Sequence, residues 1–293
     1  MRKLLRFVEA GFVVGLYHLL GLLPRHVASG FGGAFARFVG PKLSLSKRAR
    51  KNLRRFMPEL GDDGIERTIH EMWDNLGRTA AEYPHLMKFT VFVPDADIEL
   101  SGSEHIDAAK AAGKPIIFFA AHLANWELAG LVAARYGTPV HLVYREANNR
   151  YVETLFKRGR GEFAAGLIPK GSSGARLAMQ ALKEGKHLGM LLDQKMNDGI
   201  AVPFFGVDAM TAPALGALAL RFDCVILPAR VERLGSAAKF RVTVEPPLPV
   251  PQGADKDSRM IALMTAVNAR MEEWIRKRPG QWLWLHRRWP DPK

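Results

Sequence analysis

Residues 116–127 of the chain read IIFFAAHLANWE. The apolar run 116–119 predicts a buried strand, because short apolar runs without alternation are typical of strands covered on both faces. A helix is expected to begin near Trp126. His122 and Glu127 therefore lie where a strand gives way to a helix. An imidazole and a carboxylate at such a junction are candidates for acid–base chemistry.

His122 and Glu127 are five positions apart, so on one regular helix their side chains would point roughly 140° away from each other. They can pair if His122 lies in the turn and Glu127 in the first turn of the helix. The sequence then predicts that Glu127 holds one ring nitrogen of His122, while the other nitrogen faces a substrate hydroxyl. This would be a general base without a protein nucleophile. The alternative is a polar pair with a structural role alone.

Three further apolar runs predict strands, and polar residues follow two of them. The runs are 141–144, 188–192 and 225–227, and Arg145 and Asp193 follow the first two. Helices are expected near residues 126–135, 150–158, 174–183 and 213–222. This alternation predicts an α/β fold with a mostly parallel central sheet flanked by helices. Ligands bind such sheets at the carboxyl ends of the strands, where His122, Arg145 and Asp193 are expected.

The length of 293 residues fits one large α/β domain with extra helices, expected over residues 25–293. Cys224 is the single cysteine, which excludes an internal disulfide and a cysteine-based metal site and suits a reducing compartment. The 9 histidines include no paired-histidine helix motif of the kind that binds zinc. We therefore expect no metal.

The formal net charge of +13 indicates an anionic partner: nucleic acid, an acidic lipid surface, or an acidic protein or phosphorylated substrate. Within residues 47–56, basic and apolar residues fall on opposite sides of a helical wheel. The basic residues are Lys47, Arg48, Lys51, Arg54 and Arg55. Lipid headgroups or an acidic protein are the natural partners of this basic stripe, and a solvated surface helix is the alternative.

The segment 7–23 is apolar apart from Glu9 and His18, and basic residues flank it. Its roughly 17 residues are marginal for crossing a bilayer, and no small-residue cleavage site follows, so residues 1–24 are expected to remain as a membrane anchor helix. The charges favour a shallow or monotopic anchor with the catalytic domain in the cytoplasm, while a spanning helix and an ordinary buried helix stay open.

Three tryptophans, Trp282, Trp284 and Trp289, are interleaved with arginine and histidine near the end of the chain. Such rings suit a membrane interface, base stacking in a nucleic-acid channel, or packing on the core from one face of an extended segment. The apolar N-terminal segment favours lipid.

Six short blocks of sequence, spread along the chain, together resemble the motifs of one protein family. They are Asn75-Leu76-Gly77-Arg78 with Glu82, residues 121–127, Val143-Tyr144-Arg145 with Asn148-Asn149, Leu192-Asp193-Gln194, Val202-Pro203-Phe204-Phe205-Gly206 with Thr211, and residues 281–284 with His286-Arg287-Arg288-Trp289. In this order they resemble the bacterial lipid A biosynthesis acyltransferases, the late lauroyl and myristoyl transferases. The histidine-to-acid block is shared with the wider glycerolipid acyltransferases, and the resemblance implies a fold like theirs.

The resemblance implies transfer of a fatty acyl chain from acyl carrier protein to a hydroxyl of an acylated, phosphorylated glucosamine disaccharide, the lipid A precursor. The reaction would take place at the cytoplasmic face of the cell inner membrane. The partners would be the acidic acyl carrier protein, membrane lipid and the precursor, with no nucleic acid. The stripe at 47–55 or the basic cluster at 157–160 would dock the carrier protein. Its thioester is a co-substrate, and no cofactor is implied.

In that reaction His122 would be the general base and Glu127 would orient it. The resemblance also implies an arginine about thirty positions after the motif, which would bind a phosphate or the thioester oxygen. Arg158 and Arg160 both qualify. The remaining substrate-binding residues expected are Asn125, Arg145, Asp193 and Gln194.

Two alternative functions stay open. One is an acyltransferase of the same histidine–acid group that acts on another lipid or glycolipid acceptor, with acyl coenzyme A or acyl carrier protein as donor. The other is a non-catalytic basic protein that binds lipid or nucleic acid. Such a protein would tolerate the loss of His122, and its binding would show the salt dependence of phosphate contacts.

Overall fold

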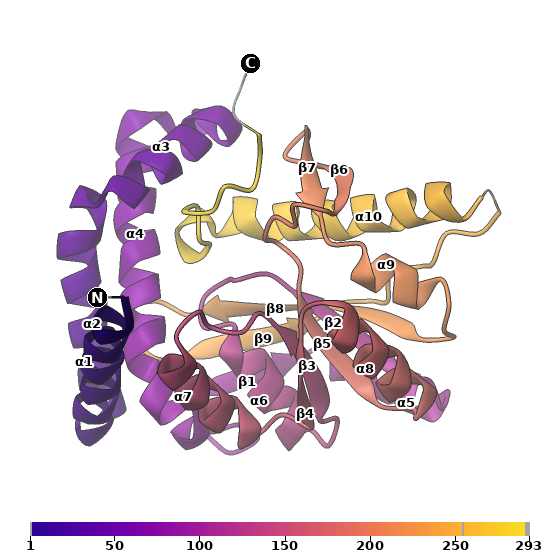
Figure 1. Cartoon of the computed structure of the whole chain (residues 1–293), viewed down its shortest axis with the longest axis horizontal. Helices are drawn as coiled ribbons and strands as arrows, with labels where there is room; N and C mark the ends of the chain where they lie inside the picture. The colour runs from indigo at the N-terminus through magenta and orange to yellow at the C-terminus, as the bar shows by residue number, and fades with distance from the viewer. Residues whose placement is uncertain (1, 254, 291–293) are drawn as a thin grey trace.

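A seven-stranded sheet forms the centre of the computed structural model, which describes residues 2–253 and 255–290 (Figure 1). The strands lie in the order β1 (Ile98–Ser101), β9 (Phe240–Val244), β8 (Val225–Arg233), β2 (Ile116–Ala120), β5 (His187–Leu191), β3 (Val140–Tyr144) and β4 (Gly166–Pro169). All neighbours are parallel except β8 and β9. The predicted α/β fold with a mostly parallel sheet is therefore confirmed. A separate antiparallel hairpin comprises β6 (Ile200–Phe204) and β7 (Val207–Thr211).

Helices cover both faces of the sheet, and the side chains of β2 point alternately to the two sides. Ile117 and Phe119 pack in one cluster with residues of α8 (Ser172–Lys183), α9 (Ala214–Ala219) and α10 (Lys256–Lys277). Ile116 and Phe118 pack on the other side with residues of α5 (Ser103–Ala111) and α6 (Glu127–Arg135). All five residues of β2 are buried, which explains its continuous apolar run.

The helices α1 (Arg2–Leu22), α2 (Arg25–Val39), α3 (Ser44–Phe56) and α4 (Gly61–Glu82) lie beside the sheet, on the left in Figure 1. Helices α2 and α4 touch so closely that a Cβ on Gly32 would lie 2.5 Å from the backbone oxygen of Gly77. A larger residue there would separate the two helices.

The expected membrane anchor, residues 1–24, corresponds to α1 and the turn that follows it. Among the described residues, no helix is both long enough and apolar enough to cross a membrane. Residue 1 of this segment, and residues 254 and 291–293 of the expected 25–293 domain, lie outside the described residues.

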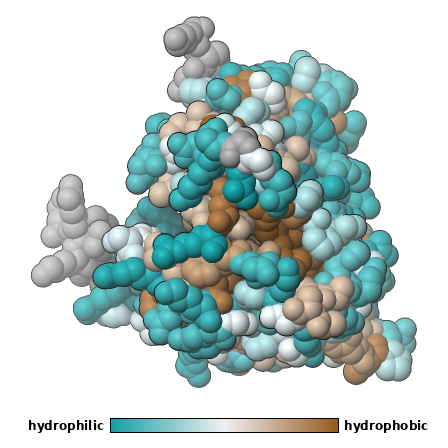
Figure 2. Space-filling model, turned by 90° about the vertical axis from the view of Figure 1, so that its right-hand side faces the viewer, coloured by the Kyte–Doolittle hydropathy of each residue, from teal (hydrophilic) through white to brown (hydrophobic). Residues whose placement is uncertain are grey.

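Large apolar side chains are exposed on one side of α1 and α2. Phe31 and Phe35 are each 60% exposed and their rings stack on each other, while Phe38 is 70% exposed. The α1–α2 apolar face, as we name it, consists of Phe12, Leu16, Leu19, Leu22, Val27, Phe31, Phe35 and Phe38. The opposite side of the molecule is mainly hydrophilic around one hydrophobic hollow (Figure 2).

The three C-terminal tryptophans belong to the core. Trp282, Trp284 and Trp289 are buried, and their rings pack on one another and on Phe204 and Phe205 of the Phe-Phe-Gly block. The expectation that these tryptophans lie at a membrane interface was wrong, because a ring enclosed by other aromatic side chains has no face left for lipid.

Helix α3 forms where the basic amphipathic helix was predicted, with its apolar side buried. Its basic side is partly used within the protein. Arg48 and Arg55 donate hydrogen bonds of 3.0 Å to the backbone oxygens of Leu285 and Pro290. The basic stripe therefore holds the C-terminal segment in place, in addition to any role in binding a partner.

Candidate active site

His122 lies in the turn between β2 and α6, as the sequence predicted. This turn passes through Ala124, whose φ of 48° lies in the left-handed region that glycine adopts more easily. The N–H of Ala124 donates to the carbonyl of Gln281 at 3.0 Å. Its carbonyl accepts hydrogen bonds from Asn75 Nδ2 at 3.2 Å and Thr79 Oγ1 at 3.0 Å. Helix α4 and the C-terminal segment therefore fix the turn that carries His122.

The imidazole of His122 is held by Asp193. The ring Nδ1 lies 2.7 Å from Oδ1 of Asp193, and the backbone N–H of His122 donates to Oδ2 at 3.0 Å. Trp282 Nε1 donates to the same Oδ2 at 2.7 Å. Ala120 pairs with Leu191 in the β2–β5 register, so the residues two positions beyond each strand come side by side.

Asp193 is completely buried, and burial by itself would raise the pKa of its carboxyl group. The charge of His122 and the hydrogen bonds from His122 and Trp282 outweigh this effect and hold the pKa of Asp193 well below its usual range. The carboxylate is therefore ionised at neutral pH and accepts a hydrogen bond from Nδ1–H of His122. This tautomer leaves the Nε2 lone pair of His122 available as a base.

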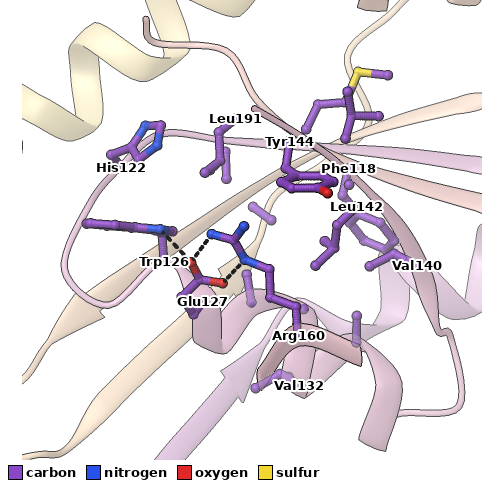
Figure 3. A pocket seen from close by; sticks show the side chains of 18 of the residues that line it. Phe118, His122, Trp126, Glu127, Val132, Val140, Leu142, Tyr144, Arg160 and Leu191 are labelled. Atoms are coloured by element: carbon purple, nitrogen blue, oxygen red, sulfur yellow. Dashed lines mark hydrogen bonds and ion pairs between the residues drawn. The ribbon is translucent and has the colours of Figure 1, made fainter. Parts of the chain in front are cut away.

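Glu127 binds Arg160 instead of His122. Its Oε1 and Oε2 accept hydrogen bonds from Nη2 and Nε of Arg160 at 2.6 and 2.9 Å, and Oε1 also accepts one from Trp126 Nε1 at 3.1 Å (Figure 3). No hydrogen bond joins Glu127 to His122 in the part of the chain that the structure describes. The predicted His122–Glu127 pairing was therefore wrong. The sheet register brings a different carboxylate to the ring, and α7 brings a guanidinium to Glu127.

Of the two candidate arginines on α7, Arg160 is the one in the site. It lies on α7 (Arg150–Gly161) and lines the same cavity as His122, whereas Arg158 does not line that cavity. Burial would lower the pKa of Arg160, but the pairing with Glu127 outweighs burial and raises it, so the side chain keeps its charge. The choice between the two arginines, which the sequence left open, falls on Arg160.

A cavity of about 390 Å³ opens beside these residues. His122, Trp126, Glu127 and Arg160 line one end of it (Figure 3). The rest of the wall is largely apolar and is contributed by the sheet and by α5 and α6. These apolar residues include Leu100, Ile106, Phe118, Val132, Ala133, Val140, Leu142, Val242 and Val244. Apolar cavities with a few polar groups at one end are typical binding sites for small molecules.

Arg145 and Gln194 also line this cavity, as expected for substrate-binding residues. Gln194 Nε2 lies 3.4 Å from Nε2 of His122 and 3.3 Å from Nε2 of His286. Burial lowers the pKa of His286 and so favours its neutral form. A neutral imidazole can accept the Gln194 amide hydrogen, and His286 is a site residue that the sequence did not single out.

Asn125 does not reach the cavity. Its side chain is fully buried, and its Nδ2 donates to Oε2 of Glu82 at 2.9 Å. The expectation that Asn125 binds substrate was therefore wrong. Asp193 is likewise sealed beneath His122, so its place in the site is to orient the ring and not to contact substrate.

The sequence also missed the part played by Trp282. The sequence block that contains Trp282 belongs to the family resemblance, but no local pattern shows that its indole reaches Asp193.

In the described part of the chain, no group of three or more His, Cys, Asp or Glu residues could hold a metal ion. The chemistry that the site can perform is proton transfer at His122 Nε2, beside the fixed positive charge of Arg160.

Comparisons with known proteins connect this geometry to an enzyme family. The chain is 26% identical to the lipid A biosynthesis palmitoleoyltransferase of Escherichia coli, over 97% of this chain and 91% of that protein. It is 25% identical to the phosphatidylinositol mannoside acyltransferase of Mycobacterium tuberculosis, over 87% and 79%. Among solved structures, the 1-acyl-sn-glycerophosphate acyltransferase of Thermotoga maritima matches 92% of this chain and 97% of its own, with 14% identity and a TM-score of 0.38.

The model of one protein family extends over nearly all of the sequence, from residue 2 to residue 291. Its description is bacterial lipid A biosynthesis acyltransferase. The motifs named in the sequence, including the turn with His122 and the strand end with Asp193, lie within this match. The chain belongs to the bacterial lipid A biosynthesis acyltransferases.

Proposed function

We propose that this acyltransferase moves a fatty acyl chain from acyl carrier protein to a hydroxyl of the lipid A precursor, with His122 as general base. The observation that carries the proposal is the His122–Asp193 pair at one end of an apolar cavity. The family relationship supports the acyl-transfer class and the lipid A precursor as acceptor.

In this reaction Nε2 of His122 takes the proton of the acceptor hydroxyl as its oxygen attacks the thioester carbonyl carbon. The new C–O bond forms, the C–S bond breaks, and the proton passes from the imidazolium to the departing thiolate. Asp193 keeps the ring in the right tautomer and stabilises the imidazolium. General-base catalysis of this kind contributes about 10²–10⁴-fold to the rate.

Arg160 is the group we assign to the developing oxyanion of the thioester. Its guanidinium lines the cavity near His122, and the two hydrogen bonds that it donates to Glu127 fix its orientation. Glu127 thus acts through Arg160 and not through the imidazole. A preorganised positive charge at a developing oxyanion is commonly the largest single contribution to such catalysis.

The apolar part of the cavity would take the acyl chain. Burying each methylene group stabilises binding by about 0.8 kcal/mol, so the space available inside would select among chain lengths. Substitution of Ala133 by Phe would fill part of the cavity, and we expect the preferred donor to become shorter. Rates with acyl carrier protein loaded with a series of chain lengths would measure this.

The α1–α2 apolar face supports a site of action at the cytoplasmic face of the cell inner membrane. Exposed phenylalanines beside basic residues fit an anionic lipid surface, and Lys42 already lies 3.7 Å from the ring centre of Phe38. Residues 1–24 would then be a shallow anchor, and the exposed phenylalanines of α2 would add to the lipid contact while the rest of the 25–293 domain lies outside the bilayer. The acidic carrier protein would dock near the basic residues of α7, close to Arg160.

Mass spectrometry of lipid A from cells that lack the protein tests the proposed function. We expect one acyl chain to be missing, and the intact protein but not His122→Ala to restore it. Purified protein supplied with acyl carrier protein thioester and the lipid A precursor should produce the same acylated product. Unchanged lipid A and no product in this assay would contradict the proposal.

A different glycolipid acceptor is the second candidate, because a relative of similar identity is named for phosphatidylinositol mannoside. The same purified protein offered both glycolipids in one reaction would separate the candidates. Acylation of the inositol mannoside alone would favour this second function.

A further inference from the structure

Two cationic side chains lie next to each other beyond the ends of β3 and β4. These strands are parallel, and Tyr144, the last residue of β3, pairs with Pro169, the last residue of β4. The next residues are Arg145 and Lys170, and the backbone N–H of Lys170 donates to the carbonyl of Tyr144 at 2.8 Å. Neighbouring strands are about 4.8 Å apart, so the two cations begin from adjacent positions.

Both side chains line the cavity that His122 and Gln194 also line. Neither has an ion pair or a side-chain hydrogen bond with any other described residue. Nearby cations differ in this respect: Arg160 binds Glu127, and Lys157 lies 3.1 Å from Glu146. The pair at 145 and 170 therefore lacks the compensating anion that its neighbours have.

The carboxylates described at this site already have partners. Glu127 and Glu146, which line the cavity, pair with Arg160 and Lys157. The charge of Asp193 also acts on Lys170, but both of its oxygens are engaged by His122 and Trp282. Lys170 is partly buried, and its pKa is lowered first by burial and also by the charge of Arg145. Two partly desolvated positive charges side by side are stabilised when an anion binds between them.

We propose that Arg145 and Lys170 form a binding site for a phosphate group of a substrate. A guanidinium offers paired donors that match phosphate oxygens, and an ammonium adds a point charge. The site is at the carboxyl ends of parallel strands, where ligands of such sheets bind. This inference rests on the proposed function, since both proposed substrates contain phosphate.

The phosphate can come from the sugar headgroup of the acceptor or from the phosphodiester that links the carrier protein to its thiol. We design the experiment to separate these sources. The variants are Lys170→Gln, Lys170→Arg and Arg145→Gln, with Lys186→Gln as the matched control. Lys186 pairs with Glu184 on the surface and does not line the cavity.

KM should be measured separately for the donor and the acceptor. Hydrogen bonds to charged groups contribute about 1.5–3 kcal/mol, so Lys170→Gln should raise KM for the phosphate-bearing substrate by roughly 10- to 100-fold. We expect kcat to change little, Lys170→Arg to restore most of the affinity, and Lys186→Gln to behave as the unaltered protein.

The assay is then repeated with acceptors that lack each phosphate and with a pantetheine thioester that lacks the phosphodiester. The substitution should cause no further rise in KM with the analogue that lacks the phosphate bound at this site, because the substitution and the missing phosphate remove the same interaction. A loss that vanishes with a dephosphorylated acceptor assigns the headgroup. A loss that vanishes with the pantetheine thioester assigns the donor. Equal losses with every substrate would overturn the inference.

Binding of inorganic phosphate tests the site without any turnover. We expect phosphate to raise the unfolding temperature of the unaltered protein and of Lys186→Gln, and to have much less effect on Lys170→Gln and Arg145→Gln. Equal stabilisation of all variants by phosphate would overturn the inference, whatever the acyl acceptor is. Absence of acyl transfer with preserved phosphate binding would instead contradict the proposed function.

Discussion

Arg233 and Glu82 form a bidentate ion pair inside the protein, with Nη1–Oε1 and Nη2–Oε2 distances of 2.6 and 3.0 Å. Their side chains are 4% and 0% exposed. Glu82 also accepts a hydrogen bond from Asn125, and Arg233 Nε donates to Asn75, which in turn binds the carbonyl of Ala124. The pair is thus joined to Ala124 and Asn125 of the turn that carries His122.

Removal of one partner of this pair should destabilise the protein strongly. Glu82→Gln leaves the guanidinium of Arg233 buried without a counter-charge, which typically costs about 3–5 kcal/mol. Urea unfolding of the purified protein measures the loss. The exposed pair Arg241–Glu99 is the control, because Glu99→Gln should change the free energy of unfolding by less than about 1 kcal/mol. Similar decreases in the free energy of unfolding in both variants would show that the buried pair contributes no more to stability than the exposed pair.

Loss of the His122–Asp193 pair should abolish catalysis while the fold persists. We expect His122→Ala to lose acyl transfer and Asp193→Asn to reduce kcat by about 10²–10⁴-fold, because the amide no longer fixes the tautomer. Initial rates with purified protein and circular dichroism of the same samples provide the measurement. Near-normal turnover of either folded variant would refute the role of this imidazole as base.

Glu127→Gln should also lose activity, through Arg160 and not through His122. The double variant Glu127→Leu with Arg160→Met should recover thermal stability, because it removes the unpaired charge that the single change leaves. It should nevertheless be at least about 100-fold less active than the unaltered protein. Thermal unfolding and initial rates are compared for the single and double variants. An active double variant would mean that the guanidinium is dispensable for the reaction.

Asp193 should make stability fall at acidic pH. Its folded-state pKa is held below the unfolded value, so its contribution is present above about pH 4 and is lost as the pH falls toward the folded-state value. Asp193→Asn removes this titration. We therefore expect the free energy of unfolding of that variant to decline less steeply below about pH 4. Parallel declines would assign the acid sensitivity to other carboxylates.

The α1–α2 apolar face should govern binding to anionic vesicles. Combined substitution of Phe31, Phe35 and Phe38 by Ser removes exposed rings, so we expect weaker sedimentation with vesicles and an unchanged unfolding temperature. Leu177→Ser is the control, because Leu177 is also exposed but lies on α8. Equal vesicle binding by both variants would place the lipid contact elsewhere.

The sheet and the position of His122 were predictable because they depend on local signals. The apolar runs that became β2, β3, β5 and β8 are covered on both faces, and a buried parallel strand shows this directly in its sequence. The parallel arrangement also predicted that His122 and Asp193 come to one edge. Glu127 was placed correctly at the start of a helix.

Contacts between distant segments were not predictable in the same way. The register of β2 with β5 decides that Asp193, and not Glu127, meets Nδ1 of His122. The direction of Arg160 depends on how α7 packs, which spacing along the chain does not reveal. Trp282 was predicted to lie at a membrane interface because an alternating run of tryptophans has the same sequence pattern whether the rings contact lipid or pack in a protein core.

The contact between Gly32 and Gly77 has a mechanical consequence. The two backbones are in close contact, and Ser29 of α2 also donates a hydrogen bond to Glu82 at 2.7 Å, so movement of α2 relative to α4 would break both contacts. A bilayer that holds α2 would hold the catalytic turn at a fixed height above the lipid. The acceptor hydroxyl would then have to lie at a constant height above the membrane to reach the imidazole. The enzyme would therefore select acceptors by the height of the hydroxyl above the lipid as well as by their chemical structure.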